Sequence, residues 1–215
     1  MGELKSQKYW RKRPVEERLK NTAIPKKYVA STLDNYDEEN GSQDVIIYAR
    51  HWLSNLEDNL NNGTGLYMFG GTGSGKTHVA TSILKRAVAT HEVCGYFITT
   101  EQYLETSYSA LDDDRYDDES PDADTIHYID NVYDILVLDG LGTERRQSEF
   151  AKKSLTSMLS KRYENQLPTI ITTDIPLNKL SSIYGNRLSS IVTDCCLFIP
   201  FLGEDYRLWR ANGEG

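Results

Sequence analysis

Gly70-Gly-Thr-Gly-Ser-Gly-Lys-Thr77 is the stretch that decides how this 215-residue chain folds. It fits the pattern G-x-x-x-x-G-K-[ST] at every specified position. In such a loop the glycines let successive backbone N–H groups turn toward phosphate oxygens, and the following helix adds the positive end of its dipole. Lys76 is then expected to reach the β- and γ-phosphates, and the Thr77 hydroxyl to ligate Mg²⁺. The residues predicted to bind a nucleoside triphosphate are Gly70, Gly71, Thr72, Gly73, Ser74, Gly75, Lys76, Thr77 and His78.

The sequence on either side of this loop has the pattern of an α/β fold. A short apolar strand leads into the loop, and a helix with a strong apolar face leaves it. The expected strands are 66–69, 93–99, 135–138, 169–173 and 197–199, and the expected helices are 45–60, 79–88 and about 148–163, with weaker patterns at 101–111 and 125–133. Because helices alternate with buried strands, we expect a parallel five-stranded sheet flanked by helices.

An acidic residue at the end of a predicted strand supports the nucleotide site. Asp139 ends the continuous apolar run 135–138, 63 residues after Lys76, where a neighbouring strand of a P-loop protein supplies the second Mg²⁺ contact. The residue after it is Gly140, at a position where many such ATPases have an acid that polarises the attacking water. Glu144 follows five residues after Asp139 and could turn into the site or be a surface residue.

Composition and charge limit the possible classes of protein. The net charge of −8 argues against a surface that coats nucleic acid, although a local contact remains open. The apolar runs are too short to cross a bilayer, and the N-terminus lacks the apolar core of a secretion signal. The three cysteines form no C-x-x-C pattern, which favours buried thiols in a reducing cytoplasm. An acidic segment, 111–124, is expected to be a solvated loop.

Residues 1–40 are predicted to form an arm and linker with at most one short helix, opened by Pro14. The arm interleaves basic side chains with apolar ones, as a helix that docks into a partner would. A disordered basic tail is the alternative. The candidate partner-binding residues are Tyr9, Trp10, Val15 and Leu19.

Several motifs together resemble the DnaC/DnaI-type helicase loaders and the related IstB transposition helpers. The motifs are Gly75-Lys-Thr-His78, the segment 135–142 with its Asp139-Gly140 pair, the strand 168–174, the Arg-Leu pair at 187–188, the tail 203–207, and the upstream segments 23–28 and 32–36. The resemblance covers roughly residues 22–210. It implies a P-loop NTPase of the AAA+ type over 41–215, with ATP and Mg²⁺ as cofactors and little or no C-terminal lid domain.

The resemblance also implies roles for individual residues. Asp174, where the family has Asn, would sense the γ-phosphate, or is a turn residue; Arg187 would be a finger that reaches a neighbouring subunit's ATP, or is a surface residue. Single-stranded DNA would contact a basic cluster that could equally be a solvated helix face. This cluster is Arg145, Arg146, Lys152 and Lys153. Because Gly140 lacks a side chain, we expect tight ATP binding with slow hydrolysis.

Three functions follow as hypotheses. The first is a loader that self-associates through its ATP site, engages a hexameric replicative helicase through the arm, and assists its loading onto single-stranded DNA. The second is a transposition helper ATPase, and the third is an adaptor that senses ATP without hydrolysing it. The arm is shorter than the usual helicase-binding domain of the loaders and resembles compact phage-like forms.

Overall fold

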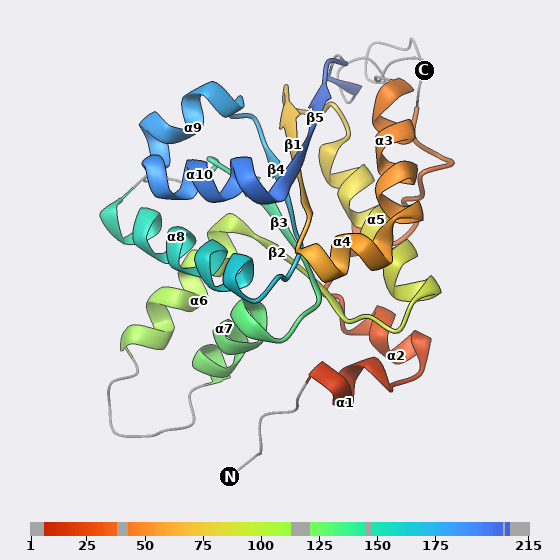
Figure 1. The fold of residues 1–215 in the computed structure, drawn as a ribbon, viewed down its shortest axis with the longest axis horizontal. Coiled ribbons are helices and arrows are strands. Elements are labelled where there is room, and N and C mark those ends of the chain that lie inside the picture. Colours follow the sequence, from red (N-terminus) through yellow and green to blue (C-terminus); the bar gives the residue numbers. More distant parts are fainter. Residues whose placement is uncertain (1–6, 38–42, 113–120, 145–147, 204, 207–215) are drawn as a thin grey trace.

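Five parallel strands form the central sheet. The computed structural model describes residues 7–37, 43–112, 121–144, 148–203 and 205–206. The strands are β1 (Gly65–Gly70), β2 (Gly95–Thr99), β3 (Ile135–Leu141), β4 (Thr169–Thr173) and β5 (Cys196–Phe201), in the spatial order β2-β3-β4-β1-β5 (Figure 1). Every neighbouring pair is parallel, so all carboxyl ends lie at one edge. The predicted five-stranded parallel sheet is confirmed.

Helices cover both faces of the sheet. α3 (Gln43–Ser54), α4 (Leu56–Asn62) and α5 (Lys76–Thr90) lie on one face, as Figure 1 shows. The other face is covered by α6 (Thr100–Asp112), α7 (Pro121–Asn131), α8 (Glu149–Glu164), α9 (Leu177–Tyr184) and α10 (Asn186–Cys195). Of the acidic segment 111–124, residues 113–120 lie outside the described residues. Among the described helices, none is both long and apolar enough to span a membrane.

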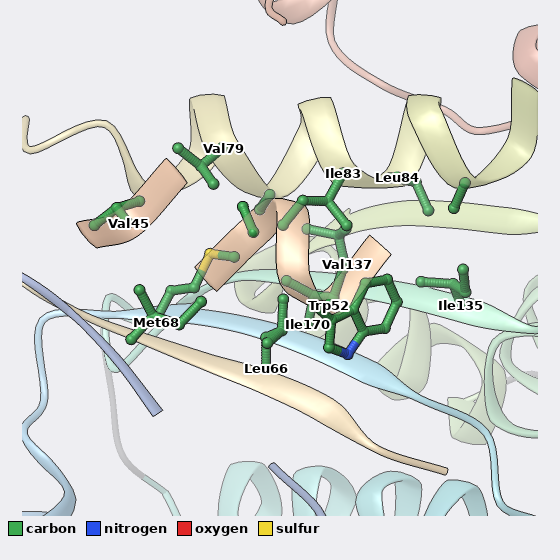
Figure 2. Packing of buried hydrophobic residues seen from close by; sticks show 14 of the residues in the cluster. Val45, Trp52, Leu66, Met68, Val79, Ile83, Leu84, Ile135, Val137 and Ile170 are labelled. Carbon is green, nitrogen blue, oxygen red and sulfur yellow. The ribbon is translucent and has the colours of Figure 1, made fainter. Parts of the chain in front are cut away.

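The side chains of each strand point alternately to the two faces of the sheet, which divides the core into two clusters. Leu66 and Met68 of β1 pack with α5 and Trp52 on one face (Figure 2), while Tyr67 joins the cluster on the other face. Successive side chains of a strand point to opposite faces, so a strand covered on both sides needs a continuous apolar run. The five segments predicted as strands therefore become the five strands of the sheet. After β5, the structure describes only residues 202–203 and 205–206, and no lid domain is formed by the described part of the chain.

The helix predicted over 45–60 is two helices in the structure. Asn55 separates α3 from α4, and its amide donates to the His51 carbonyl oxygen at 2.8 Å. The buried Asn59 amide donates to the Trp52 carbonyl oxygen at 2.8 Å. These side chains satisfy carbonyl groups at the end of α3, so the chain can bend there while Trp52 stays fully buried.

Two helices, α9 and α10, lie where no helix is predicted from the sequence. Gly185, with φ of +90°, separates them. Each is only two to three turns long, so its apolar residues recur too few times for a helical pattern to stand out in the sequence. Together they cover the end of α8 and one edge of the sheet, where Leu180, Leu188 and Val192 are fully buried.

The arm contains more helix than predicted, and it packs on the sheet domain. It forms α1 (Gln7–Arg11), α2 (Val15–Lys20) and the short 3₁₀ helix η1 (Lys26–Tyr28), so the expectation of at most one short helix is wrong, although Pro14 does precede α2. The buried Arg18 donates to the Val93 carbonyl oxygen at 2.9 Å, and the Phe97 N–H donates to the Thr22 carbonyl oxygen at 2.8 Å. The arm is therefore anchored beside the amino end of β2.

Arg162 is a fully buried charge that joins the amino ends of β3 and β4 to α7 and α8. Its guanidinium donates to the carbonyl oxygens of Ile129, Tyr133, Asp134 and Pro168 and to the Thr169 hydroxyl. Burial lowers its pKa to about 9, and the nearby Asp130 and Asp134 oppose that shift. The side chain therefore stays protonated at neutral pH and keeps all its donors.

Candidate nucleotide site

The glycine-rich loop leads from β1 into α5 at the carboxyl edge of the sheet. Gly75 immediately precedes α5 and has φ of +92°, a conformation that disfavours any residue with a Cβ. A Cβ at this position would lie 2.6 Å from the Tyr36 ring. The loop therefore needs glycine here both for its turn and for the close approach of Tyr36. The first N–H groups of the 15-residue α5 face the loop, as a phosphate site requires.

Lys76 lies at the centre of this loop and is nearly buried, at 8% exposure. Its ammonium donates to the carbonyl oxygens of Gly70 at 2.9 Å and Gly71 at 2.6 Å. It also forms an ion pair of 2.8 Å with Asp174, whose other oxygen accepts from the Thr72 hydroxyl at 2.8 Å. Asp174 therefore lies directly across the loop from Lys76, at the end of β4.

The Asp174 carboxylate is ionised at neutral pH. Partial burial alone would raise its pKa, but hydrogen bonds from Lys76 and Thr72, together with the charge on Lys76, outweigh burial and lower the pKa. An ionised carboxylate only accepts hydrogen bonds, whereas an amide at this place could donate to a phosphate oxygen. Asp174 would therefore offer a γ-phosphate a different chemistry from the asparagine that the sequence resemblance leads us to expect there.

Thr77 and Asp139 lie together, as the sequence predicts for two Mg²⁺-binding residues. The Thr77 hydroxyl donates to the Asp139 carboxylate at 2.7 Å, and the Thr172 hydroxyl donates to the same oxygen at 2.7 Å. Hydroxyl and carboxylate oxygens are hard donors that fit Mg²⁺. Thr172, on β4, is a contributor that sequence reasoning missed; its only signal is its place near the end of an apolar strand.

Gly140 occupies a bulge next to Asp139. Its φ is +76°, and the pairing of β3 with β4 shifts register between Leu138 and Leu141. A Cβ at this position would lie 2.9 Å from the Thr143 hydroxyl. Thr143 donates that hydroxyl to the Gly140 carbonyl oxygen at 2.7 Å, which holds the bulge closed. An acidic side chain at position 140 would therefore be strained in this backbone.

Glu144 is neither on the surface nor in the nucleotide cavity. It is 8% exposed, and its carboxylate accepts from the Gly142 N–H at 2.9 Å and from the Tyr184 hydroxyl. Burial, with the hydrogen bond to Glu144, raises the pKa of Tyr184, so Tyr184 keeps the proton it donates. The interpretation of Glu144 as a surface residue is wrong, and in this structure its carboxylate joins the β3 bulge to α9.

A cavity of about 770 Å³ lies over the loop and the strand ends. Its lining includes the loop from Thr72 to His78, the strand-end residues Asp139, Gly140 and Asp174, and Glu101 at the start of α6. The opposite wall comes from the arm, a contribution that the sequence interpretation of 1–40 as a partner-binding segment missed. These wall residues are Lys27, Tyr28, Ser31, Asn35, Tyr36 and Asp37.

Backbone contacts fix the arm wall against the loop helix. Tyr36 donates its hydroxyl to the Ser74 carbonyl oxygen at 3.2 Å, and His78 Nε2 lies 2.8 Å from the Thr32 carbonyl oxygen. Burial, reinforced by the charge on Lys85, lowers the pKa of His78, so its neutral ring donates to Thr32. The Lys85 ammonium donates to the carbonyl oxygens of Val29, at 2.7 Å, and of Ser31. On the far side of the loop, the Tyr206 N–H donates to the Gly73 carbonyl oxygen at 3.3 Å.

Arg187 lies outside this cavity. It is on α10, its side chain is 71% exposed, and its guanidinium reaches Ser160 Oγ at 3.3 Å and Glu164 at 3.9 Å. A second groove, of about 730 Å³ between α8 and α9–α10, brings Arg187 together with Lys152 and Lys153. The two other predicted DNA-binding residues, Arg145 and Arg146, lie outside the described residues.

Of the predicted partner-binding residues on the arm, Tyr9 is the most exposed, at 36%. Trp10 is half-buried and its ring contacts Tyr9 edge to face. Val15 is half-buried, and Leu19 packs against the core cluster below α5. Leu19 therefore has a role in anchoring the arm.

The sheet order, the glycine-rich loop and the Thr77–Asp139 pair define a P-loop NTPase of the AAA+ type. Among solved structures, the DnaC helicase loader is 28% identical with a TM-score of 0.72, over 82% of this chain and 99% of that one. DnaI, at 18% identity, has a TM-score of 0.64 over 88% and 98%. AMPPCP-bound DnaA from Aquifex aeolicus, also at 18%, has a TM-score of 0.62 over 89% and 56%. The last two likenesses show the fold alone.

The family described as IstB-like ATP binding protein matches residues 3–211. No curated protein sequence matches the chain. Because the family match spans nearly the whole chain, this protein belongs to the IstB-like ATP-binding proteins.

Proposed function

We propose that this protein is an ATP-dependent loader that engages a hexameric replicative helicase and assists its loading onto single-stranded DNA. The observation that carries the proposal is the similarity to the DnaC helicase loader, which extends over 99% of that chain. The match covers 82% of this chain, and the nucleotide cavity described above lies at the carboxyl edge of its sheet.

ATP would bind with its phosphates in the loop and its base toward the arm wall. Lys76 would leave Asp174 to contact the β- and γ-phosphates. Mg²⁺, held through Thr77 and Asp139, would neutralise charge on the phosphate oxygens. Tyr28 and Tyr36 of the arm line the cavity, and an aromatic wall suits the flat, apolar faces of a purine. Hydrolysis would be slow, because Gly140 offers no side chain to the attacking water.

Self-association would complete the site. Arg187 is exposed and far from its own cavity lining, so in this proposal it reaches the ATP of a neighbouring subunit. Lys152 and Lys153 lie in the same groove as Arg187 and, with Arg145 and Arg146, would contact the backbone of single-stranded DNA. A finger and a DNA-binding face on one groove would let assembly and DNA contact depend on each other.

The helicase contact would lie on the outer surface of α1 and α2, within the arm segment 1–40, while 41–215 forms the ATPase domain. Tyr9, Trp10 and Val15 supply apolar anchors there, bordered by Lys8 and Lys12. Deleting the arm would also remove the contacts of Arg18 and Leu19 with the sheet domain. A loss of helicase binding could then come from unfolding instead of from a lost interface. A single exposed side chain is therefore the better test.

The test is a pull-down from the native host with four baits: wild type, Tyr9→Ala, Tyr108→Ala and Lys76→Ala. Tyr108 is a matched control, because it is an exposed tyrosine on α6, away from the arm. A hexameric helicase should accompany wild type and Tyr108→Ala, be reduced with Tyr9→Ala, and lose any ATP dependence with Lys76→Ala. Recovery of a transposase in its place would contradict the loader assignment.

Two alternatives each have an observation in their favour. The family description favours a transposition helper, for which the partner would be a transposase. The glycine at position 140 favours an adaptor that senses ATP, for which a purified protein would bind ATP without turnover even with helicase and DNA present.

A further inference from the structure

The arm wall of the nucleotide cavity is attached to the loop helix along one side of α5. His78 and Lys85 are about two helical turns apart, so their side chains leave α5 on the same side. His78 contacts the Thr32 carbonyl oxygen, and the Lys85 ammonium holds the part of the wall that precedes it. The helix whose first N–H groups face the phosphate loop therefore also carries the groups that hold the opposite wall.

Lys85 binds three carbonyl oxygens of the wall with one ammonium group. It donates to the carbonyl oxygens of Val29 at 2.7 Å, Tyr28 at 3.2 Å and Ser31. An ammonium has three N–H donors, so backbone groups of the wall occupy all of them. Of these residues, Tyr28 and Ser31 line the cavity and Lys85 does not. Lys85 thus fixes two lining residues without facing the nucleotide itself.

The next turn of the wall is held by its own side chains. The Thr32 N–H donates to Asn35 Oδ1 at 2.8 Å, and the Asn35 N–H donates to Thr32 Oγ1 at 3.1 Å. The Asn35 amide also donates to the Ala30 carbonyl oxygen at 3.0 Å. Such bonds between short polar side chains and the nearby backbone fix a turn locally. The wall therefore has two kinds of support, which are this turn and the attachment of the preceding residues to α5 through Lys85.

We propose that Lys85 is a positioning residue that sets the affinity for the base of the nucleotide, because it fixes the wall segment 28–31 on which the base packs. The inference rests on the proposed binding of ATP and adds a residue that touches no part of it. A segment that is ordered before ATP arrives loses little freedom on binding, so more of the packing energy appears as affinity. Without Lys85, ATP itself must order the segment. The phosphates, which bind at 70–77, should be unaffected.

The test compares wild type with Lys85→Met, Lys85→Arg and a matched control, Arg86→Met, in the full-length protein. Methionine keeps the length of the side chain and removes its donors. Arginine keeps the charge, but its planar fork does not match three carbonyl oxygens that converge on one ammonium. Arg86 is the next residue of α5 and is exposed. The ligands are MgATP and magnesium tripolyphosphate, which has the phosphates without base or sugar, and calorimetry measures both Kd values.

We expect Lys85→Met to weaken the binding of MgATP about 5- to 100-fold, the range of a lost contact between a base and an aromatic ring. Lys85→Arg should weaken it less, by at least about threefold. The binding of tripolyphosphate should stay within about twofold of wild type in both variants. Arg86→Met should bind both ligands as wild type does.

The outcomes separate this inference from the proposed function. A wild type that binds neither ligand removes the proposed function itself. If wild type binds ATP and every folded Lys85 variant keeps the wild-type ratio of the two Kd values, the role of Lys85 alone is overturned. A parallel loss for ATP and tripolyphosphate also overturns it, because Lys85 then only stabilises α5. Thermal unfolding identifies the variants that fold, and Lys85→Arg decides by itself if Lys85→Met does not.

Discussion

Replacing Asp174 by Asn should tighten the binding of ATP more than that of ADP. In the structure, Asp174 pairs with the lysine that the phosphates need, at 2.8 Å, and its lowered pKa keeps it negatively charged at neutral pH. ATP must therefore displace this carboxylate from Lys76 and then bind beside its negative charge. The Asp174→Asn variant removes both obstacles and adds an amide N–H that can donate to the γ-phosphate.

The size of the effect follows from the exposure of the pair. The Asp174 side chain is 47% exposed, and ion pairs of that kind contribute about 0.2–1 kcal/mol. Like charges about 4 Å apart in a water-like medium add about 1 kcal/mol for ATP. We therefore expect ATP to bind about 7- to 30-fold more tightly to Asp174→Asn, and ADP at most about fivefold, since about 1.4 kcal/mol is a factor of ten.

Titration of wild type and variant with MgATP and MgADP, by calorimetry at low and high salt, measures both values. Asp194→Asn is the control, because it removes the same charge from an exposed residue outside the cavity. The difference should shrink at high salt, where exposed charges are screened. The difference should also shrink as pH falls through the lowered pKa of Asp174, because protonation removes the charge of Asp174 in the wild type, as the substitution does in the variant. Weaker ATP binding by Asp174→Asn, or an equal gain for ATP and ADP, would refute this reasoning.

Two further predictions concern the carboxyl edge of the sheet, and a third concerns its amino end. Thr77→Ala should leave metal-free nucleotide binding within about threefold of wild type but remove most of the gain from Mg²⁺, which a titration with and without EDTA measures. Gly140→Glu should not raise ATP turnover, and should lower the free energy of unfolding by about 1–2 kcal/mol, because its φ is +76°; a stable and faster enzyme would show that the bulge rearranges. Arg162→Met should lower the free energy of unfolding by about 3–5 kcal/mol in urea, since it leaves several buried carbonyl groups, that of Asp134 among them, without their donor; a loss below about 1 kcal/mol would mean that water replaces the guanidinium.

The sheet could be predicted from the sequence because its evidence is local. The strands β1, β3 and β5 contain continuous apolar runs, and the loop from Gly70 to Thr77 is specified almost residue by residue. Asp139 could be placed because a strand end has a fixed position relative to the loop. The Ser148 N-cap of α8, which accepts from the Ala151 N–H at 3.1 Å, is local in the same way.

The rest depends on contacts that leave no pattern in the sequence. The interpretation of Glu144 missed its partner, Tyr184, which is 40 residues away on a helix that the sequence did not predict. The arm wall is held largely through carbonyl oxygens such as that of Thr32, and every residue type has a carbonyl. Glu101 looks in the sequence like an ordinary acid at a helix start, and only the structure shows that it lines the nucleotide cavity, since the register pairs Thr99 with Asp139.

If the proposed helicase contact is correct, the arm wall would couple the binding of ATP to the binding of the helicase. Residues 27–37 contact the loop helix through Tyr36, His78 and Lys85, and the same chain segment continues into α2, where the proposed helicase contact lies. If helicase binding shifts this segment and changes the affinity for ATP by some factor, ATP must change the affinity for the helicase by that same factor. A titration of either ligand in the presence of the other should thus give the same coupling free energy. The difference between this value for ATP and for ADP would be the free energy by which ATP hydrolysis weakens the helicase contact.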